Sequence, residues 1–171
     1  MSRPVNGEGG TVDGFEAAIT VTSEMFTDAL PGLGLTVNYT STDSKVKANP
    51  EDEDFITLPG LSDEVWNATL FYEIGGFSAR VSQRYRSDFL GELQGFGAGR
   101  EFRVVGEETL VDAQVSYEIQ EGRYAGLTFY LQGNNLTDEP FVTFGSEDDE
   151  RQVINYEEYG PTYLVGMSYK F

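Results

Sequence analysis

The sequence contains neither cysteine nor histidine among its 171 residues. Without cysteine the chain can form no disulfide and offers no thiol nucleophile. Without histidine it lacks the usual activating base of a nucleophilic triad and the commonest zinc ligand. We therefore expect no catalysis, no bound metal and no cofactor.

Positive charge is also scarce in this chain. Lysine and arginine number 11 against 29 aspartates and glutamates, which gives a formal net charge of −18 at pH 7. Because phosphate binding requires clusters of lysine and arginine, this balance excludes a nucleic-acid partner.

Long apolar runs are the third absence. No segment approaches the roughly 20 consecutive apolar residues of a membrane-spanning helix, which excludes a helical membrane protein. A transmembrane β-barrel remains a possible interpretation, because each of its strands gives a much weaker sequence signal than a membrane-spanning helix. Residues 1–10 contain no apolar stretch and no cleavage site, so we expect that they are not a secretory leader. If the chain belongs in an outer membrane, we therefore expect it to be part of a longer precursor.

What the sequence does contain is 13% aromatic residues and 20 glycines, a composition typical of all-β chains with many turns. The clearest strand is the last stretch, 160–171, where apolar residues occupy every second position from Tyr163 to Phe171. Such alternation indicates a strand with one apolar face and one more polar face. Six further segments alternate in the same way. The pattern predicts strands over 13–22, 35–42, 64–73, 77–86, 111–117, 127–134 and 160–171.

The connections between these strands alternate in length, short then long, along the whole chain. The short ones are 23–34, 74–76 and the turn at 121–123, and the long ones are 44–62, 87–108 and 136–158. Bacterial outer-membrane barrels have short periplasmic turns and long external loops, whereas a soluble sandwich has no reason to sort its connections in this way. We therefore predict an all-β fold, an antiparallel, up-and-down, curved sheet of about seven strands that is open at both edges. Its convex face should carry Phe15, Val37, Leu70, Val81, Val115, Phe129 and Val165.

The aromatic residues of the apolar face agree with this orientation. With the long connections outside, the outer ends of the strands carry a belt of Tyr39, Trp66, Tyr85 and Tyr163. The inner ends carry a second belt of Tyr72, Phe77, Tyr117, Tyr169 and Phe171. Two aromatic belts on the apolar face are what the two interfaces of a bilayer select.

The polar face of the fourth predicted strand carries a row of arginines, namely Arg80, Arg84 and Arg86. We predict that they form a lumen charge network with carboxylates on the neighbouring strands, since opposite charges across a ladder are ordinary in a barrel lumen. The expected partners are Asp112, Glu118 and Glu73, with Asp112 close to Arg84 or Arg86. The alternative is that the arginine row contacts an anionic substrate.

Three further motifs do not indicate a site. The acidic runs 51–54 and 147–150, the second with Glu157 and Glu158 nearby, lack the alternating spacing and turn glycine of a calcium loop. We interpret both runs as solvated external loops. The glycine-rich stretch 95–99 follows no strand and precedes no helix with a phosphate-binding lysine, which excludes a phosphate-binding loop.

Several segments together resemble TonB-dependent outer-membrane receptors. The most specific are NNLTDEPF at 134–141 and YGPTYLVGMSYKF at 159–171, and further similar stretches lie at 14–21, 30–44, 58–89 and 110–119. The resemblance covers essentially the whole chain. It implies that residues 1–171 are the C-terminal strands of a transmembrane β-barrel of about 22 strands, whose lumen is plugged by an N-terminal domain. Nothing in the chain matches the plug, the segment that touches TonB or the earlier strands.

The resemblance implies a bacterial outer-membrane receptor that takes up a scarce ligand with energy from TonB. The ligand stays open among an iron chelate, cobalamin and an oligosaccharide. The implied partners are outer-membrane lipid and lipopolysaccharide, the remainder of the receptor, TonB through the missing part, and the barrel-assembly machinery. Gly166, Tyr169 and Phe171 match the family's terminal assembly signal, although Leu164 is apolar where that signal usually begins with a polar residue.

Two other classes of function are weighed against this one. The first is a small self-contained outer-membrane barrel or adhesin-like binding module, which would need one more strand. Residues 1–10, with three glycines and a proline, cannot supply that strand. The second is an outer-membrane lipase or protease, which the absence of histidine disfavours.

Overall fold

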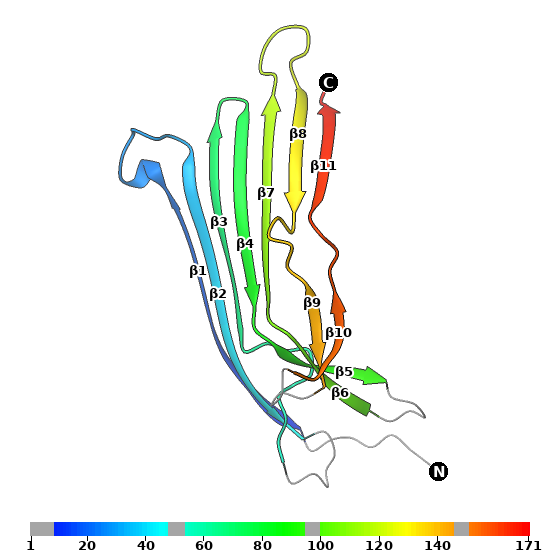
Figure 1. Cartoon of the computed structure of the whole chain (residues 1–171). Helices are drawn as coiled ribbons and strands as arrows, with labels where there is room; N and C mark the ends of the chain where they lie inside the picture. Colours follow the sequence, from blue (N-terminus) through cyan, green and yellow to red (C-terminus); the bar gives the residue numbers. More distant parts are fainter. Residues whose placement is uncertain (1–8, 48–53, 95–99, 146–150) are drawn as a thin grey trace.

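The computed structural model describes residues 9–47, 54–94, 100–145 and 151–171. Its main body is an antiparallel sheet with the strand order β1-β2-β3-β4-β7-β8-β11 (Figure 1). These strands are β1 (Gly10–Thr22), β2 (Leu33–Val46), β3 (Glu64–Ile74), β4 (Phe77–Arg86), β7 (Glu108–Glu118), β8 (Leu127–Asn134) and β11 (Thr162–Tyr169). Each pairs antiparallel with the next, which confirms the predicted up-and-down sheet. β1 and β11 are its two open edges.

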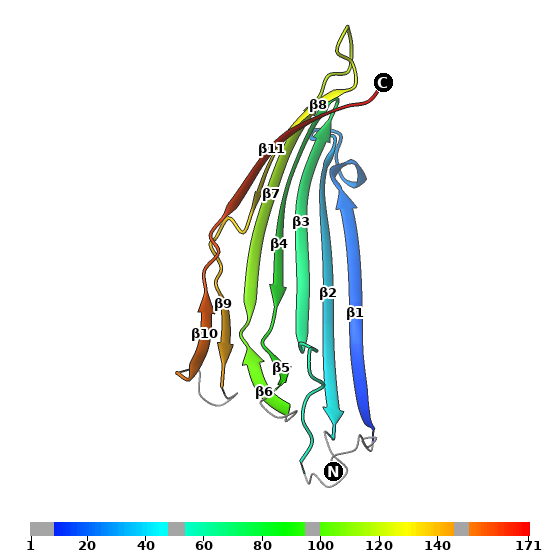
Figure 2. The same cartoon turned by 90° about the vertical axis from the view of Figure 1, so that its right-hand side faces the viewer.

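The first two strands are longer than the alternation predicted. β2 continues past the predicted end at 42 because its main chain keeps pairing with β1 as far as Gly10, opposite Val46. A short 3-10 turn, η1 (Ser23–Met25), lies in the connection that follows β1. Turns at this end of the sheet, which also holds the C-terminus, are short, whereas the long connections gather at the other end (Figures 1 and 2).

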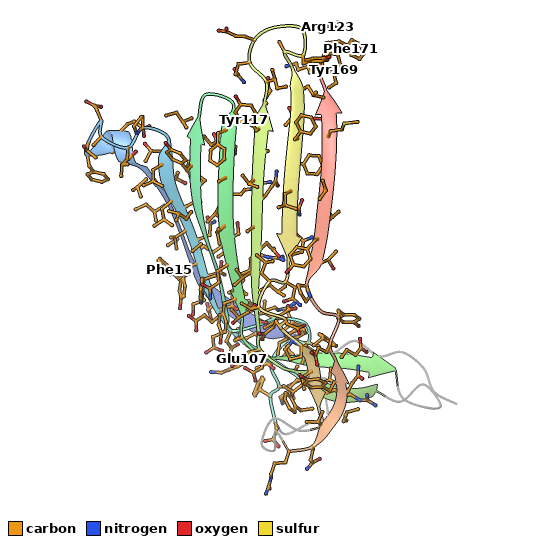
Figure 3. The ribbon with its side chains drawn as sticks, turned by 45° about the horizontal axis from the view of Figure 1, so that its top comes forward. Phe15, Glu107, Tyr117, Arg123, Tyr169 and Phe171 are labelled. Atoms are coloured by element: carbon orange, nitrogen blue, oxygen red, sulfur yellow. The ribbon has the colours of Figure 1, made fainter. Side chains whose placement is uncertain are left out.

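The register of the main sheet decides which side chains share a face, since a shift by one residue would move every side chain to the other side. Leu70 lies opposite Val81, and Val115 lies opposite both Ala79 and Leu131. Followed from strand to strand, these pairs place all seven predicted apolar residues on one face. The sheet bends from β1 round to β11, and Phe15 points away from it on the outer side of the bend (Figures 1, 2 and 3). The predicted apolar convex face is therefore confirmed.

A second, smaller sheet corrects the prediction that 87–108 and 136–158 are loops. It consists of β5 (Phe89–Gln94), β6 (Arg100–Val105), β9 (Phe141–Phe144) and β10 (Val153–Glu157), in the order β10-β9-β6-β5. β6 and β9 pair through Val104 opposite Phe144 and thereby join the two long connections. Each strand is too short to alternate convincingly by itself. β5 pairs with β6 and β9 with β10 as neighbours along the chain, whereas the pairing of β6 with β9 brings together segments far apart in the sequence.

The apolar residues that are buried lie in this second sheet rather than in the main one. Among the described residues, Leu90 and Val104 are the only buried hydrophobic side chains, at 8% and 5% exposed. The convex face of the main sheet, by contrast, leaves large side chains exposed, including Phe15 at 62% and Val165 at 83%. The main sheet therefore has no core of its own and presents an apolar surface.

The predicted aromatic belts lie at opposite ends of the main sheet, with the exception of Tyr163. The register places Tyr163 opposite Gly133, in the row of Ala113 and Val81, two rows nearer the short turns than Tyr85. At the end with the long connections, the rings of Trp66 and Tyr85 stack with centroids 5.8 Å apart. At the end with the short turns, Tyr72 and Phe77 lie 6.2 Å apart, and Tyr117 is opposite Phe77 in the ladder. Figure 3 shows Tyr117, Tyr169 and Phe171 at this same end.

Candidate functional site

The predicted contact between Asp112 and Arg84 is present on the concave face. Nη2 of Arg84 on β4 lies 3.1 Å from Oδ2 of Asp112 on β7. The register places Asp112 opposite Ser82, so Arg84 reaches the carboxylate diagonally along the same face. The Arg84 side chain is 59% exposed, and solvent therefore screens this ion pair.

Arg80 and Arg86 do not pair with carboxylates as predicted. Arg80 lies opposite Gln114 and donates from Nη2 to the Gln114 side-chain oxygen over 2.6 Å. Glu118 is out of reach of Arg80, because the register puts it opposite Thr128 at the short-turn end. Glu73 lies at that end too and accepts a hydrogen bond from the Ser78 hydroxyl (3.4 Å). The predicted lumen network therefore contains one ion pair among these residues, not three.

Arg86 belongs to a cluster at the other end of the sheet. It donates from Nε to the Ser62 hydroxyl (2.6 Å) and from Nη2 to the Gly60 carbonyl (2.7 Å). Its guanidinium lies 3.7 Å from the centre of the Phe89 ring, a cation–π contact. Ser62, which is 4% exposed, donates in turn to the Ser87 carbonyl (3.0 Å). Arg86 therefore holds the connection before β3 against the start of the connection after β4, a role that the alternation did not reveal.

Asp112 has a second partner that the sequence analysis missed. Its Oδ1 accepts the backbone N–H of Asn135 over 3.0 Å. The Asn135 side chain then closes a turn, because its Oδ1 accepts the Glu139 N–H (2.8 Å) and its Nδ2 donates to the Glu139 carbonyl (3.1 Å). Asn135 has a φ of 51°, a left-handed conformation that asparagine tolerates better than most residues. The NNLTDEP segment is thus an ordered turn anchored on β7, which the sequence analysis did not predict. Asparagine is a residue type that favours such turns.

A small polar hollow of about 170 Å³ opens beside Asp112 on the concave face. Its lining includes Arg80, Gln114, Gln132 and Asn134, so hydrogen-bond donors and acceptors stand side by side. Gln132 donates from Nε2 to Oδ1 of Asn134 over 2.8 Å. Such a lining can bind polar groups of either kind, and it carries both a cation and a carboxylate.

The residues of the expected assembly signal lie at the end of the chain. Gly166 is opposite Tyr130 on the concave face, and a Cβ added to it would collide with the Tyr130 ring. Glycine at this position therefore leaves room for the Tyr130 ring. Tyr169 and Phe171 lie with ring centroids 6.2 Å apart, and Phe171 is fully exposed. Their role in assembly stays a prediction.

The remaining sequence motifs form no site in the described part of the chain. The glycine-rich stretch 95–99, the acidic run 147–150 and residues 51–53 of the other acidic run lie outside the described residues. Glu157 accepts a hydrogen bond from the Asn155 side chain (2.5 Å). Within 9–47, 54–94, 100–145 and 151–171, no three acidic side chains are grouped so that they could hold a metal ion.

The two faces of the main sheet define the class of protein. A curved, up-and-down antiparallel sheet with an apolar convex face, a polar concave face and two open edges is a section of a β-barrel wall. A family model described as "TonB dependent receptor-like, beta-barrel" matches residues 2–136. The chain belongs to this family of receptor-like β-barrels. No curated protein and no solved structure matches the chain.

Over the residues that the structure describes, no helix has the length and the apolar character that crossing a bilayer would require.

Proposed function

We propose that this chain is the C-terminal barrel section of an outer-membrane receptor that takes up a scarce ligand with energy from TonB. The observation that carries the proposal is the continuous, exposed apolar convex face, which runs from Phe15 on β1 to Val165 on β11. In water such a face would be an aggregation site, whereas hydrocarbon covers it at no cost in hydrogen bonds. The family match supports the receptor class, and the ligand is an iron chelate, cobalamin or an oligosaccharide.

The orientation follows from the connections and the belts. The short turns and the C-terminus face the periplasm, and the second sheet with the long connections faces outward (Figure 2). Trp66 and Tyr85 then lie at the outer interface, and Tyr72, Phe77 and Tyr117 at the inner one. The concave face lines the lumen, where the Arg84–Asp112 ion pair joins two neighbouring strands and has a structural, not a catalytic, role.

The two open edges of the main sheet disfavour the alternative that the chain is a small self-contained barrel. β1 pairs only with β2 and β11 only with β8 in the main sheet, so the described strands do not close on themselves. In the receptor, the plug and the earlier strands would complete the barrel, with lipopolysaccharide and lipid around it. The barrel-assembly machinery would insert it through the signal at Gly166, Tyr169 and Phe171, and TonB would contact the part outside this chain.

The test uses the complete receptor gene that encodes this chain. Cells carrying it are fractionated, and their growth is measured with an iron chelate, cobalamin or an oligosaccharide as the limiting nutrient, with and without TonB. We expect the protein in the outer membrane and growth on one of the three that is lost without TonB. Recovery in the soluble fraction, or uptake unaffected by the loss of TonB, would refute the proposal.

A further inference from the structure

A groove of about 440 Å³ crosses the convex face of the main sheet. It follows two neighbouring rows of residues that the register aligns across the strands. One row runs from Leu70 to Tyr163 through Val81, Ala113 and Gly133, and the other passes through Ala79. The groove therefore runs across the strands and not along them.

The groove exists because three positions in these rows have a small side chain or none. Ala79, Ala113 and Gly133 lie beside larger residues of the same face, so the surface drops where they meet. One end is also walled off by a residue from outside the sheet. Leu136, in the turn after β8, folds back over Gly133, where an added Cβ would lie 2.6 Å from Cδ2 of Leu136 and 3.4 Å from the Tyr163 ring.

The groove offers hydrocarbon and almost nothing that can form hydrogen bonds. Two polar residues border it, but the alternation of the strands directs the side chains of Arg80 and Gln114 to the concave face, where they bond each other. A peptide segment in the groove would bring main-chain N–H and C=O groups with no partners, at a cost of several kcal/mol each in an apolar environment. A hydrocarbon chain has no such groups and fits this lining.

The position of the groove indicates which hydrocarbon chain occupies it. The next row toward the short turns contains Phe77 and Tyr117 of the inner aromatic belt, with Phe129 beside them. The groove thus begins just inside the bilayer interface that faces the periplasm, where the leaflet is phospholipid. Its volume falls within the range of about 300–1,000 Å³ in which small ligands are bound.

We propose that this groove binds one acyl chain of a phospholipid, as a retained lipid distinct from the exchanging lipid around the barrel. This inference rests on the proposed function, because it requires the convex face to lie in a bilayer. Retention follows from the walls, since Leu136 and Tyr163 block lateral movement at one end and Val81 and Leu70 border the rest.

The test is native mass spectrometry of the complete receptor, purified from outer membranes in a mild detergent and titrated with palmitoyl-oleoyl-phosphatidylethanolamine. Ala113→Trp fills the groove, and we expect it to lose one tightly retained phospholipid relative to the wild type. The matched control is Ala68→Trp. Ala68 lies on the same face, opposite Val37 and Gln83, but outside the groove. We expect this control to retain the wild-type number of lipids.

A second variant and a second lipid keep the outcome decisive. Leu136→Ala opens the closed end and should weaken retention even if Ala113→Trp fails to assemble. In a parallel titration with lipid A, all variants should match the wild type. Equal phospholipid retention in the wild type, Ala113→Trp and Leu136→Ala would overturn the proposal. It would also be overturned if the groove variants selectively lost lipid A, or a bound protein, instead of phospholipid. Failure of the proposed function would look different, because neither wild type nor control would then be recovered from the outer membrane.

Discussion

At the residue scale, the partner of each charged side chain on the concave face depends more on which residue the register places nearby than on the sign of the charges. Arg80 contacts a neutral glutamine because Gln114 is its neighbour in the ladder, whereas Arg84 reaches Asp112 diagonally. Asp112, on the concave face, uses both of its carboxylate oxygens as hydrogen-bond acceptors. One of its oxygens accepts from Arg84, and the other accepts the main-chain N–H that begins the Asn135 turn.

The first prediction concerns Asp112. Asp112→Ala removes both acceptors and leaves the Asn135 N–H without its partner. We expect the free energy of unfolding of the complete receptor to fall by about 1–2 kcal/mol, the lower part of the range for an unsatisfied polar group because the site is partly exposed. The measurement is urea unfolding of the detergent-solubilised barrel.

The conservative replacement separates the two contacts. Asp112→Asn keeps an oxygen for the Asn135 N–H and loses only the screened ion pair, so it should cost less than the alanine variant. Glu118→Gln, on the same strand and face, is the control and should leave unfolding unchanged. Equal losses for Asp112→Asn and Asp112→Ala would show that the turn does not depend on this acceptor.

A second prediction concerns Glu24 in the connection between β1 and β2, outside the strands of the barrel wall. Its Oε1 accepts the Gly32 N–H over 2.5 Å, and this hydrogen bond, with others from the backbone and from Thr22, lowers the pKa of the Glu24 carboxyl below its ordinary value of 4.5. A lowered pKa in the folded state means that the carboxylate stabilises the turn above the unfolded pKa. That contribution is lost as the pH falls through the folded pKa.

The measurement is amide hydrogen exchange at Gly32 as a function of pH, expressed as protection relative to an unfolded peptide. We expect protection to be constant at neutral pH and to decline below the ordinary glutamate pKa. Glu24→Gln, which cannot ionise, should flatten this dependence. An identical pH profile in the two proteins would assign the protection to the backbone alone.

At the scale of elements, β11 is the strand on which the predicted barrel closes. It pairs with β8 on one side only, and its convex side chains are among the most exposed in the described chain, with Val165 at 83% and Met167 at 71%. In a bilayer the unpaired main-chain groups of such an edge cost several kcal/mol each, so a partner strand is required. We expect that partner to be the first strand of the complete barrel.

The third prediction tests the end of this strand. Phe171 is fully exposed beside Tyr169 and contributes no core packing, so its removal should cost little folding stability. If it directs assembly, deleting it from the complete receptor should lower the amount found in the outer membrane several-fold. Immunoblots of fractionated cells measure this, with Lys170→Ala as the neighbouring control. A normal level of the deleted form would remove Phe171 from the assembly signal.

At the scale of the whole molecule, the chain is a curved wall, the main sheet, joined to the smaller second sheet at the end with the long connections. The second sheet joins the long connections to each other (Figure 1). Hydrogen bonds from Arg86 to Gly60 and from the Asn135 N–H to Asp112 link these connections to the wall. The wall itself has no apolar interior, because its convex face is exposed and its concave face is polar. Under the proposed function, the stability of this part depends on further strands that pair with its edges and on a bilayer that covers its convex face.

The fourth prediction follows from the two open edges. Residues 1–171 alone should neither insert into a bilayer as a monomer nor transport a ligand, since both β1 and β11 would leave main-chain groups unpaired in hydrocarbon. Refolding into detergent micelles, followed by light scattering, should give oligomers or aggregates. A folded monomer that withstands this treatment would contradict the requirement for further strands.

The sequence by itself determined the strands of the wall, their order and their faces. Alternation is a local property, so 160–171 or 64–73 indicates a strand with one apolar side without any knowledge of its neighbours. Strands joined by short connections are expected to pair with each other. The pairings across the long connections followed from the alternation of short and long connections that is typical of outer-membrane barrels. The apolar convex face could be predicted for the same reason, since parity along each strand places its residues. Tyr163 of the predicted outer belt is an exception to the belts, because its row is set by the register of β11 on β8.

Only the tertiary structure decided the features that depend on contacts between distant segments. β6 and β9 are short and acquire their partners when two long connections meet at Val104 and Phe144. The partners of Arg80 and Arg86, the anchoring of Asn135 on Asp112 and the groove over Ala113 depend on the register and on which side chain approaches from outside the sheet. Periodicity places a side chain on a face but not opposite a given residue, because its neighbour across the ladder is set by how the strands align.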